Sequence, residues 1–178
     1  MHQALGDYEA LIRPLEERMI RSVWRVVQNS ADAEDAFQEA VATIWRRIER
    51  IRRHENPPAL VLRICVDAAC DVLRKKARRS RRESPLARAE SLAGDFPDAA
   101  TPVCEHEQRT EVARAIARLP ARQATAVTMR HLLDHPYREI AEALGCAEAT
   151  ARVHVARGIE RLGTLLAHLN PTLCTEKP

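Results

Sequence analysis

The chain has 178 residues, enough for one helical domain or for two small ones that each bury a core. Ala, Leu, Arg and Glu are abundant, whereas there are five glycines and two residues each of Trp, Tyr and Phe, which favours an all-α protein over a many-stranded sheet. The formal net charge of +3 excludes a general polycation, so a nucleic-acid site must depend on where the basic residues cluster.

The sequence gives no sign of a membrane segment, a disulfide scaffold or a metal site. Residues 1–14 contain no basic segment followed by an apolar core, and no apolar stretch reaches the roughly 20 residues that span a bilayer. We therefore expect a cytoplasmic protein without membrane insertion. The cysteines are odd in number and never spaced as CxxC, and Cys104 with His106 is the only close Cys and His pair. We expect no metal and no cofactor. The cysteines are Cys65, Cys70, Cys104, Cys146 and Cys174.

The first predicted element is one amphipathic helix from about Tyr8 to Val27. Its apolar residues recur at three- and four-residue steps, which is typical of a single buried stripe. Pro14 lies near the start of this helix, where a missing N–H group is tolerated.

A second helix is predicted after Asp32, which is a plausible N-cap. Its opposite face carries Asp35, Gln38 and Glu39, whose i, i+3, i+4 spacing places them together on the exposed side. Taken alone, this pattern is more typical of an ordinary solvated helix face than of a binding site. The predicted buried stripe is Phe37, Val41, Ile44, Ile48 and Ile51.

A third helix is expected to begin near Pro57 and Pro58, because proline suits the first helical turn. It is apolar around most of its circumference and completes a three-helix bundle. One polar ridge remains, and a run of basic residues without an acid extends from Arg74 to Arg82; such a run can also be a frayed, solvated helix end. The polar ridge consists of Arg63, Asp67, Asp71, Arg74 and Arg78.

Residues 83–103 lose helical periodicity and collect prolines, a glycine and small polar residues, which predicts a flexible linker. We therefore expect two small helical domains, at residues 1–82 and 105–170, joined by a linker at residues 83–104.

The C-terminal domain ends in a predicted helix-turn-helix, roughly from Pro136 to Leu162. One short helix carries Val112, Ile116 and Leu119, and Pro120 restarts a second that carries Ala124, Val127 and Leu132. Gly145 then supplies a left-handed turn between two further helices. Their predicted buried residues are Ile140, Ala141 and Leu144 in the first, and Ala151, Val155, Ile159 and Leu162 in the second.

In such a motif the second helix lies in the major groove of DNA. Arg152 is the strongest candidate for a base or phosphate contact, because its planar fork can pair with two acceptors of one guanine. An αα-hairpin within an ordinary bundle is the alternative explanation. The candidate DNA-contacting residues are Arg138, Ala149, Thr150, Arg152, Val153, His154 and Arg157, of which Arg138, His154 and Arg157 suit phosphates best.

Read together from about Tyr8 to Leu166, these segments resemble the two conserved regions of bacterial extracytoplasmic-function (ECF) sigma factors. They are DAEDAFQEAVATIW, NPPALVLRICVDAACDVLRKKARR, the linker, and the stretch from AIARLPARQ to ARGIERL. The resemblance implies a non-enzymatic protein that binds core RNA polymerase and promoter DNA. Asp35, Gln38 and Glu39 match the family's DxxQE surface, which docks on the clamp coiled coil of the polymerase β′ subunit. Contact with the β subunit and inhibition by an anti-sigma factor are also implied.

By the same resemblance, one domain faces the promoter's −10 element and the helix-turn-helix reads the −35 element. The −10 residues would be Arg63, Asp67, Asp71, Arg74, Lys75 and Arg78, and the −35 residues those named above.

The chain departs from the family pattern at two places. Leu60, Val61 and Asp67 stand where the family usually has Trp, Leu and Asn, and a DNA strand repels the carboxylate of Asp67 unless Arg63 or Arg74 neutralises it. Pro136 stands where the family often has a capping serine, which leaves Glu139 without a reciprocal capping partner.

Two other functions remain compatible with the sequence. One is a sigma-like interaction protein that sequesters an anti-sigma factor, and the other is a stand-alone helix-turn-helix regulator.

Overall fold

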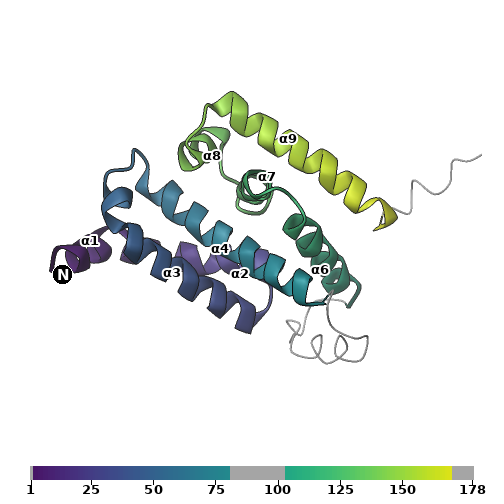
Figure 1. The fold of residues 1–178 in the computed structure, drawn as a ribbon, viewed down its shortest axis with the longest axis horizontal. Helices are drawn as coiled ribbons and strands as arrows, with labels where there is room; N and C mark the ends of the chain where they lie inside the picture. The colour runs from purple at the N-terminus through teal and green to yellow at the C-terminus, as the bar shows by residue number, and fades with distance from the viewer. Residues whose placement is uncertain (1, 81–102, 170–178) are drawn as a thin grey trace, which may run out of the picture.

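The computed structural model describes residues 2–80 and 103–169, here called the N-terminal half and the C-terminal half (Figure 1). Every element in them is helical, which confirms the predicted all-α class. The N-terminal half contains α1 (His2–Leu11), a 3-10 turn (Arg13–Leu15), α2 (Glu16–Val27), α3 (Ser30–Arg52) and α4 (Pro57–Ser80). The C-terminal half contains α6 (Val103–Ala117), α7 (Ala121–Val127), a π-helical segment (Thr128–Leu132), α8 (Tyr137–Leu144), α9 (Glu148–Leu165) and a 3-10 turn (Ala167–Leu169).

Most of the predicted linker, residues 83–102, lies outside the described residues, and its last two residues belong to α6. No helix in the described part of the chain is both long and apolar enough to cross a membrane.

The prediction of one continuous first helix is wrong, because the chain forms α1 and α2 with a 3-10 turn between them. Pro14 has no N–H group and its ring crowds the preceding turn, so the α-helical ladder stops there. The amide of Leu15 bonds the carbonyl of Ile12 at 2.8 Å and closes the tighter turn. The apolar stripe nevertheless stays continuous, since Ile12, Leu15, Met19 and Val23 are all buried.

The α1 helix is anchored by Tyr8. Its ring stacks on that of Trp45 with 5.0 Å between centroids, and its hydroxyl donates to Glu16 at 3.0 Å. Burial and the neighbouring Glu16 carboxylate raise the pKa of Tyr8 to about 12, so the phenol stays protonated at neutral pH.

The α3 helix is capped by Asn29. The prediction that Asp32 caps this helix is therefore wrong. The Asn29 side chain accepts the amide of Asp32 at 2.9 Å, and the Asp32 carboxylate instead pairs with Lys76 at 2.8 Å. The core-facing side also differs from the predicted stripe, because Phe37 and Val41 are only partly buried. The buried residues of α3 are Ala33, Ala36, Ala40, Ile44, Ile48 and Ile51.

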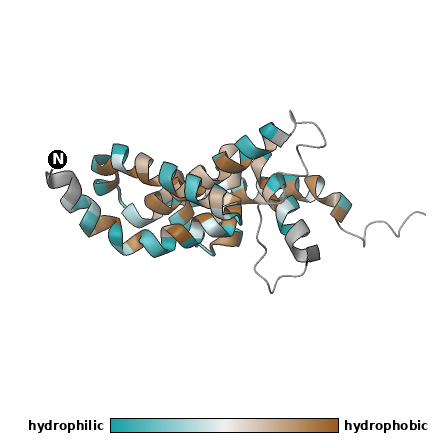
Figure 2. Ribbon diagram, turned by 90° about the horizontal axis from the view of Figure 1, so that it is seen from below, coloured by the Kyte–Doolittle hydropathy of each residue, from teal (hydrophilic) through white to brown (hydrophobic). Residues whose placement is uncertain are grey.

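The α4 helix is the centre of the molecule. It begins at Pro57 as predicted, and the Asn56 side chain caps it by accepting the amide of Ala59 at 3.1 Å. It packs on α2 and α3 on one side and on α6, α7 and α8 on the other (Figure 1). Its nearly uniform apolar circumference is therefore explained by burial on two sides. Figure 2 shows hydrophobic residues concentrated along the middle of the molecule, and one buried cluster extends from Ile12 to Leu162.

The α9 helix packs on α7 through Gly158. A Cβ atom at this position would lie 2.4 Å from Cγ2 of Val127, so only glycine permits the observed approach. The buried series is Ala151, Val155, Gly158 and Leu162. The prediction that Ile159 is buried is therefore wrong, because its side chain is 43% exposed.

The predicted helix-turn-helix is present as α8 and α9. Gly145 has a φ of 62°, the left-handed conformation expected of it. The amides of Gly145 and Cys146 close the turn on the carbonyls of Glu142 and Ala141, at 3.2 and 3.0 Å.

Candidate nucleic-acid interface

The outer surface of the helix-turn-helix carries the predicted DNA-contacting residues. Figure 1 shows α9 on the outer side of the C-terminal half, with α7 and α8 between it and α4. His154 is half-buried, and the other predicted residues are exposed: Arg138, Ala149, Thr150, Arg152, Val153 and Arg157.

The Arg152 side chain is held in place by an aromatic ring that sequence reasoning missed. Its guanidinium lies 4.2 Å from the centre of the Tyr137 ring and donates to the Glu148 carboxylate at 2.5 Å. The guanidinium of Arg130 lies 4.9 Å from the same ring. Tyr137 is one of only two tyrosines and begins α8, which was the available signal. The fork of Arg152 is thus oriented before any ligand binds, with further donors left over.

Glu139 finds a partner other than the missing serine. Pro136 occupies the N-cap of α8 without a side-chain hydrogen bond, as expected, and the Glu139 carboxylate lies 2.8 Å from Nδ1 of the buried His135. Arg130 donates to the carbonyl of His135 at 3.2 Å. These contacts fix the segment that leads into α8.

The acidic and amide residues of α3 share one exposed face, as their spacing predicted. Asp35, Gln38 and Glu39 are all exposed, and Glu39 accepts a hydrogen bond from Arg46 at 3.2 Å. More than half of each of these two ion-pair side chains is exposed, so the pair constrains the face only weakly.

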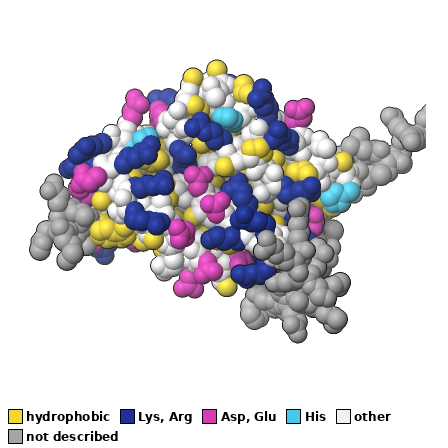
Figure 3. All heavy atoms as spheres, viewed as in Figure 1, with side chains coloured by type: hydrophobic (Ala, Val, Ile, Leu, Met, Phe, Trp, Pro, Cys, Tyr) yellow, Lys and Arg dark blue, Asp and Glu magenta, His cyan; other side chains and the backbone are white. Residues whose placement is uncertain are grey.

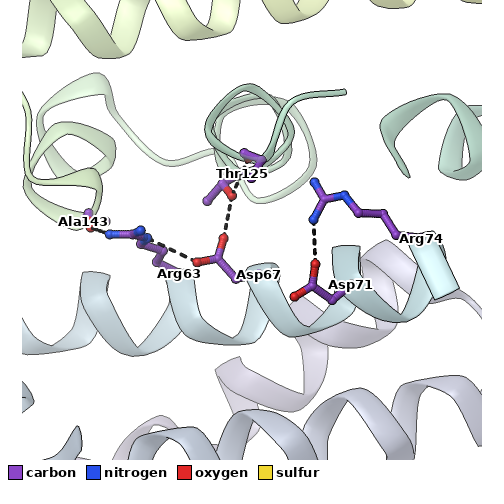
Figure 4. A network of polar contacts seen from close by, with 7 residues as sticks. Arg63, Asp67, Asp71, Arg74, Thr125 and Ala143 are labelled. Atoms are coloured by element: carbon purple, nitrogen blue, oxygen red, sulfur yellow. Dashed lines mark hydrogen bonds and ion pairs between the residues drawn. The ribbon is translucent and has the colours of Figure 1, made fainter. Parts of the chain in front are cut away.

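The polar ridge of α4 is divided between solvent and the C-terminal half (Figure 4). Arg63 donates to the Ala143 carbonyl of α8 at 2.7 Å and to Asp67 at 3.3 Å. The Asp67 carboxylate also accepts the Thr125 hydroxyl of α7 at 2.6 Å. Of the two arginines expected to neutralise Asp67, Arg63 is therefore the one that pairs with it.

The second half of the ridge is more open. Arg74 donates to Asp71 at 2.7 Å and, in a longer contact of 3.5 Å, to the Leu119 carbonyl. Lys75 and Arg78 are exposed. Figure 3 shows Lys and Arg side chains interspersed with Asp and Glu on the face seen in Figure 1, not one continuous basic surface.

No metal-binding cluster is found within the described ranges: no three His, Cys, Asp or Glu residues are arranged to hold an ion. Cys65 and Cys70 are free and buried, and Cys146 is half-buried. The side chains of Cys104, His106 and Cys174 lie outside the described part of the chain.

Both halves match models of one protein family. Residues 11–79 match sigma-70 region 2 and residues 109–162 match sigma-70 region 4. The chain is also 30% identical over 166 residues to an ECF RNA polymerase sigma-E factor of Haemophilus influenzae. This match covers 88% of this chain and 87% of that protein. The chain belongs to the ECF sigma factors. It is thus a non-enzymatic initiation factor that binds DNA through its helix-turn-helix and directs RNA polymerase to promoters.

Other ECF sigma factors are similar along most of this chain. It is 29% identical to the ECF sigma factor SigM of Mycobacterium tuberculosis, over 92% of this chain and 79% of that one. It is 27% identical to the sigma-E factor of Streptomyces coelicolor, over 88% and 84%. The fold is shared with a solved structure of the sigma factor RpoE of Bartonella quintana in complex with the anti-sigma factor NepR. The TM-score is 0.52 and the sequence identity is 18%, and the match covers 90% of this chain and 97% of that one.

Proposed function

We propose that this ECF sigma factor contacts the promoter at two sites: α9 recognises the −35 element, and the polar ridge of α4 recognises the −10 element. The observation that carries the −35 assignment is the guanidinium of Arg152, which lies over the Tyr137 ring on the exposed face of α9. A bidentate contact needs such a planar donor pair in a defined orientation. Arg138 and Arg157 flank it and suit neighbouring phosphates.

On the −10 side, we assign contact with the opened strand to Arg63, Asp67, Asp71, Arg74, Lys75 and Arg78. The exposed Lys75 and Arg78 continue into a run of basic residues that attracts the phosphate backbone, with an affinity that falls as salt rises. A base that leaves the stack costs a few kcal/mol, which protein contacts must offset.

Polymerase docking is assigned to Asp35, Gln38 and Glu39 on the exposed face of α3, with the β′ clamp coiled coil as the partner. The exposed acidic and amide groups suit a partner surface of basic and hydrogen-bonding character. We further propose domains at residues 1–82 and 105–170 with a linker at 83–104, contact with the β subunit, an anti-sigma factor as regulator and a cytoplasmic location. Complex formation with an anti-sigma factor in the Bartonella quintana relative supports that partner class.

Transcription in vitro tests this function, with sigma-free core polymerase, the purified chain and a library of promoters. We expect transcripts whose start sites share sequences at −35 and −10, and loss of selection at −35 with Arg152→Ala. Arg122→Ala is the matched control, because Arg122 is an exposed arginine of α7 outside the helix-turn-helix. Polymerase binding without any transcript would favour the alternative of a sigma-like protein that sequesters an anti-sigma factor. Tight binding to duplex DNA without binding to polymerase would favour the stand-alone regulator.

A further inference from the structure

The face of α4 that packs against α6, α7 and α8 is the face to which contact with the −10 element is assigned. Cys70 lies in the middle of it, three residues after Asp67 and four before Arg74, and is only 1% exposed. The fully buried Thr128 of the π-helical segment lies beside the Cys70 thiol. The C-terminal half therefore fills the space that a DNA strand would need along this part of the helix.

Three arginines of the N-terminal half end on backbone carbonyls of the C-terminal half, at or just beyond the ends of helical segments. Arg25 donates to the Leu132 carbonyl at 2.7 Å, at the last residue of the π-helical segment. Arg63 reaches Ala143 in the last turn of α8, and Arg74 reaches Leu119, two residues after α6 ends. Carbonyls at helix ends lack intrahelical donors and carry partial negative charge, so they attract guanidinium groups as phosphates do.

Two side-chain pairs complete the contact. Asn56, in the turn before α4, donates to the Glu142 carboxylate of α8 at 2.6 Å. Thr125, which is 2% exposed, donates to Asp67. A carboxylate is a stronger acceptor for this hydroxyl than the amide usual in the family, and it also repels a phosphate strand. Asp67 therefore favours the C-terminal half over DNA on both grounds.

The observed arrangement cannot be the promoter-bound one. The −35 and −10 elements are by their names roughly 25 base pairs apart, or about 85 Å along a duplex at about 3.4 Å per base pair. Here α8 touches the α4 ridge at hydrogen-bond distance, so the two DNA-reading surfaces lie on one compact body. Segment 81–102 can reach at most about 75 Å when fully extended, so the covalent connection allows the halves to separate widely.

We propose that the free sigma factor closes on itself, with α6, α7 and α8 occupying the −10 face of α4. The Thr125–Asp67 hydrogen bond and the three arginine–carbonyl contacts hold this closed form, and promoter DNA competes for two of these arginines, Arg63 and Arg74. The proposal rests on the −10 assignment made above. Because the Asp67 side chain is 42% exposed, its contact is modest, which makes the closure reversible.

Closure leaves the other two surfaces free. Asp35, Gln38 and Glu39 are exposed on α3, and Arg152 and Val153 are exposed on α9. The closed form can therefore meet polymerase and duplex −35 DNA while its −10 face stays covered. This sets an order of events, in which recruitment precedes the opening that uncovers α4.

Site-resolved alkylation of the full chain with N-ethylmaleimide tests the closure. Burial raises the pKa of the Cys70 thiol to about 12, so in the closed form it is both covered and protonated. In the unaltered chain, we expect Cys70 to react far more slowly than the half-buried Cys146. In the Thr125→Val variant, which removes the hydroxyl but keeps the side-chain shape, Cys70 should react several-fold faster than it does in the unaltered chain. Thr164→Val, the same change at an exposed site of α9, should leave the Cys70 rate unchanged.

Cys65 serves as the internal reference, because it is fully buried on α4, which packs on α2 and α3 within the N-terminal half. It should stay protected in every variant. Equal Cys70 rates with and without Thr125→Val, or a Cys70 rate that matches Cys146 in the unaltered chain, would overturn the closure. So would a parallel rise of Cys65, because it would mean loss of the N-terminal fold and not separation of the halves.

Binding of a random-sequence single-stranded oligonucleotide separates closure from the −10 assignment. We expect Thr125→Val to bind it several-fold more tightly than Thr164→Val does. Faster Cys70 alkylation without tighter DNA binding would leave closure standing and overturn the −10 assignment on which the proposal rests.

Discussion

The hydroxyl of Thr125 donates a 2.6 Å hydrogen bond to the carboxylate of Asp67 and so joins α7 to α4 across the two halves of the chain. Thr125 is buried and Asp67 is half-exposed, so water can solvate the carboxylate when the donor is removed. This contact can therefore be tested without leaving a buried charge unpaired.

A double-mutant cycle measures the contact directly. Thr125→Val and Asp67→Ala should each lower the free energy of unfolding of the full chain in urea by about 1 kcal/mol. Because both changes remove the same hydrogen bond, the double variant should lose less than the sum, with a coupling of about 0.5–1 kcal/mol. Strictly additive losses would mean that the two side chains do not interact in solution.

The close approach of α9 to α7 predicts a strong effect at Gly158. Gly158→Ala places a methyl group 2.4 Å from Val127 Cγ2, and we expect it to destabilise the chain by about 1–3 kcal/mol. Gly163→Ala is the control, because this position on the same helix has no atom within 4 Å of an added Cβ. It should stabilise by up to about 1 kcal/mol through helix propensity. Equal effects at both glycines in thermal unfolding would contradict the packing described.

The stacking of Arg152 on Tyr137 predicts a graded effect on −35 recognition. Arg152→Ala should cost about 1–3 kcal/mol of discrimination between promoter duplexes in a binding assay. Tyr137→Ala should lose part of it because the guanidinium is no longer oriented, whereas Tyr137→Phe keeps the ring and should keep the discrimination. If Tyr137→Phe and Tyr137→Ala behave alike, the ring does not position Arg152.

The exposed face of α3 predicts a separable defect in polymerase binding. Asp35→Ala combined with Gln38→Ala should weaken binding to core polymerase by tenfold or more, while circular dichroism and melting temperature stay unchanged. Glu49→Ala is the matched control, since Glu49 is an exposed carboxylate of the same helix that lies ten residues after Glu39, roughly 15 Å further along the helix axis. An unchanged affinity for the double variant would remove Asp35 and Gln38 from the docking surface.

The helices and the helix-turn-helix could be predicted because their signals are local. Apolar periodicity, Pro57 and Pro120 at helix starts, and Gly145 at a left-handed turn each act within a few residues. Two errors also had local causes, since Pro14 breaks the first helix and Asn29 caps α3 ahead of Asp32. The error at Ile159 came from a tertiary contact: Gly158 has no hydrophobic side chain, so periodicity selected Ile159 in its place.

The candidate site was only partly predictable for the same reason. The shared exposed faces of α3 and α9 follow from helical spacing, and both are present. The covering of α4 depends on arginines that bond the main-chain carbonyls of Leu119, Leu132 and Ala143. Every residue has a main-chain carbonyl, so no sequence pattern identifies these three as the acceptors. A helix apolar around most of its circumference was the one available sign that α4 is buried on two sides.

The closed free form is the central claim, and energy transfer between the two halves tests it most directly. Donor and acceptor dyes can be placed at Glu55, an exposed residue before α4, and at Glu160, an exposed residue of α9, through non-canonical amino acids that spare the native cysteines. The closed form predicts efficient transfer in the free chain and loss of most of it once core polymerase and promoter DNA are bound. Transfer as weak in the free chain as in the promoter complex would contradict it.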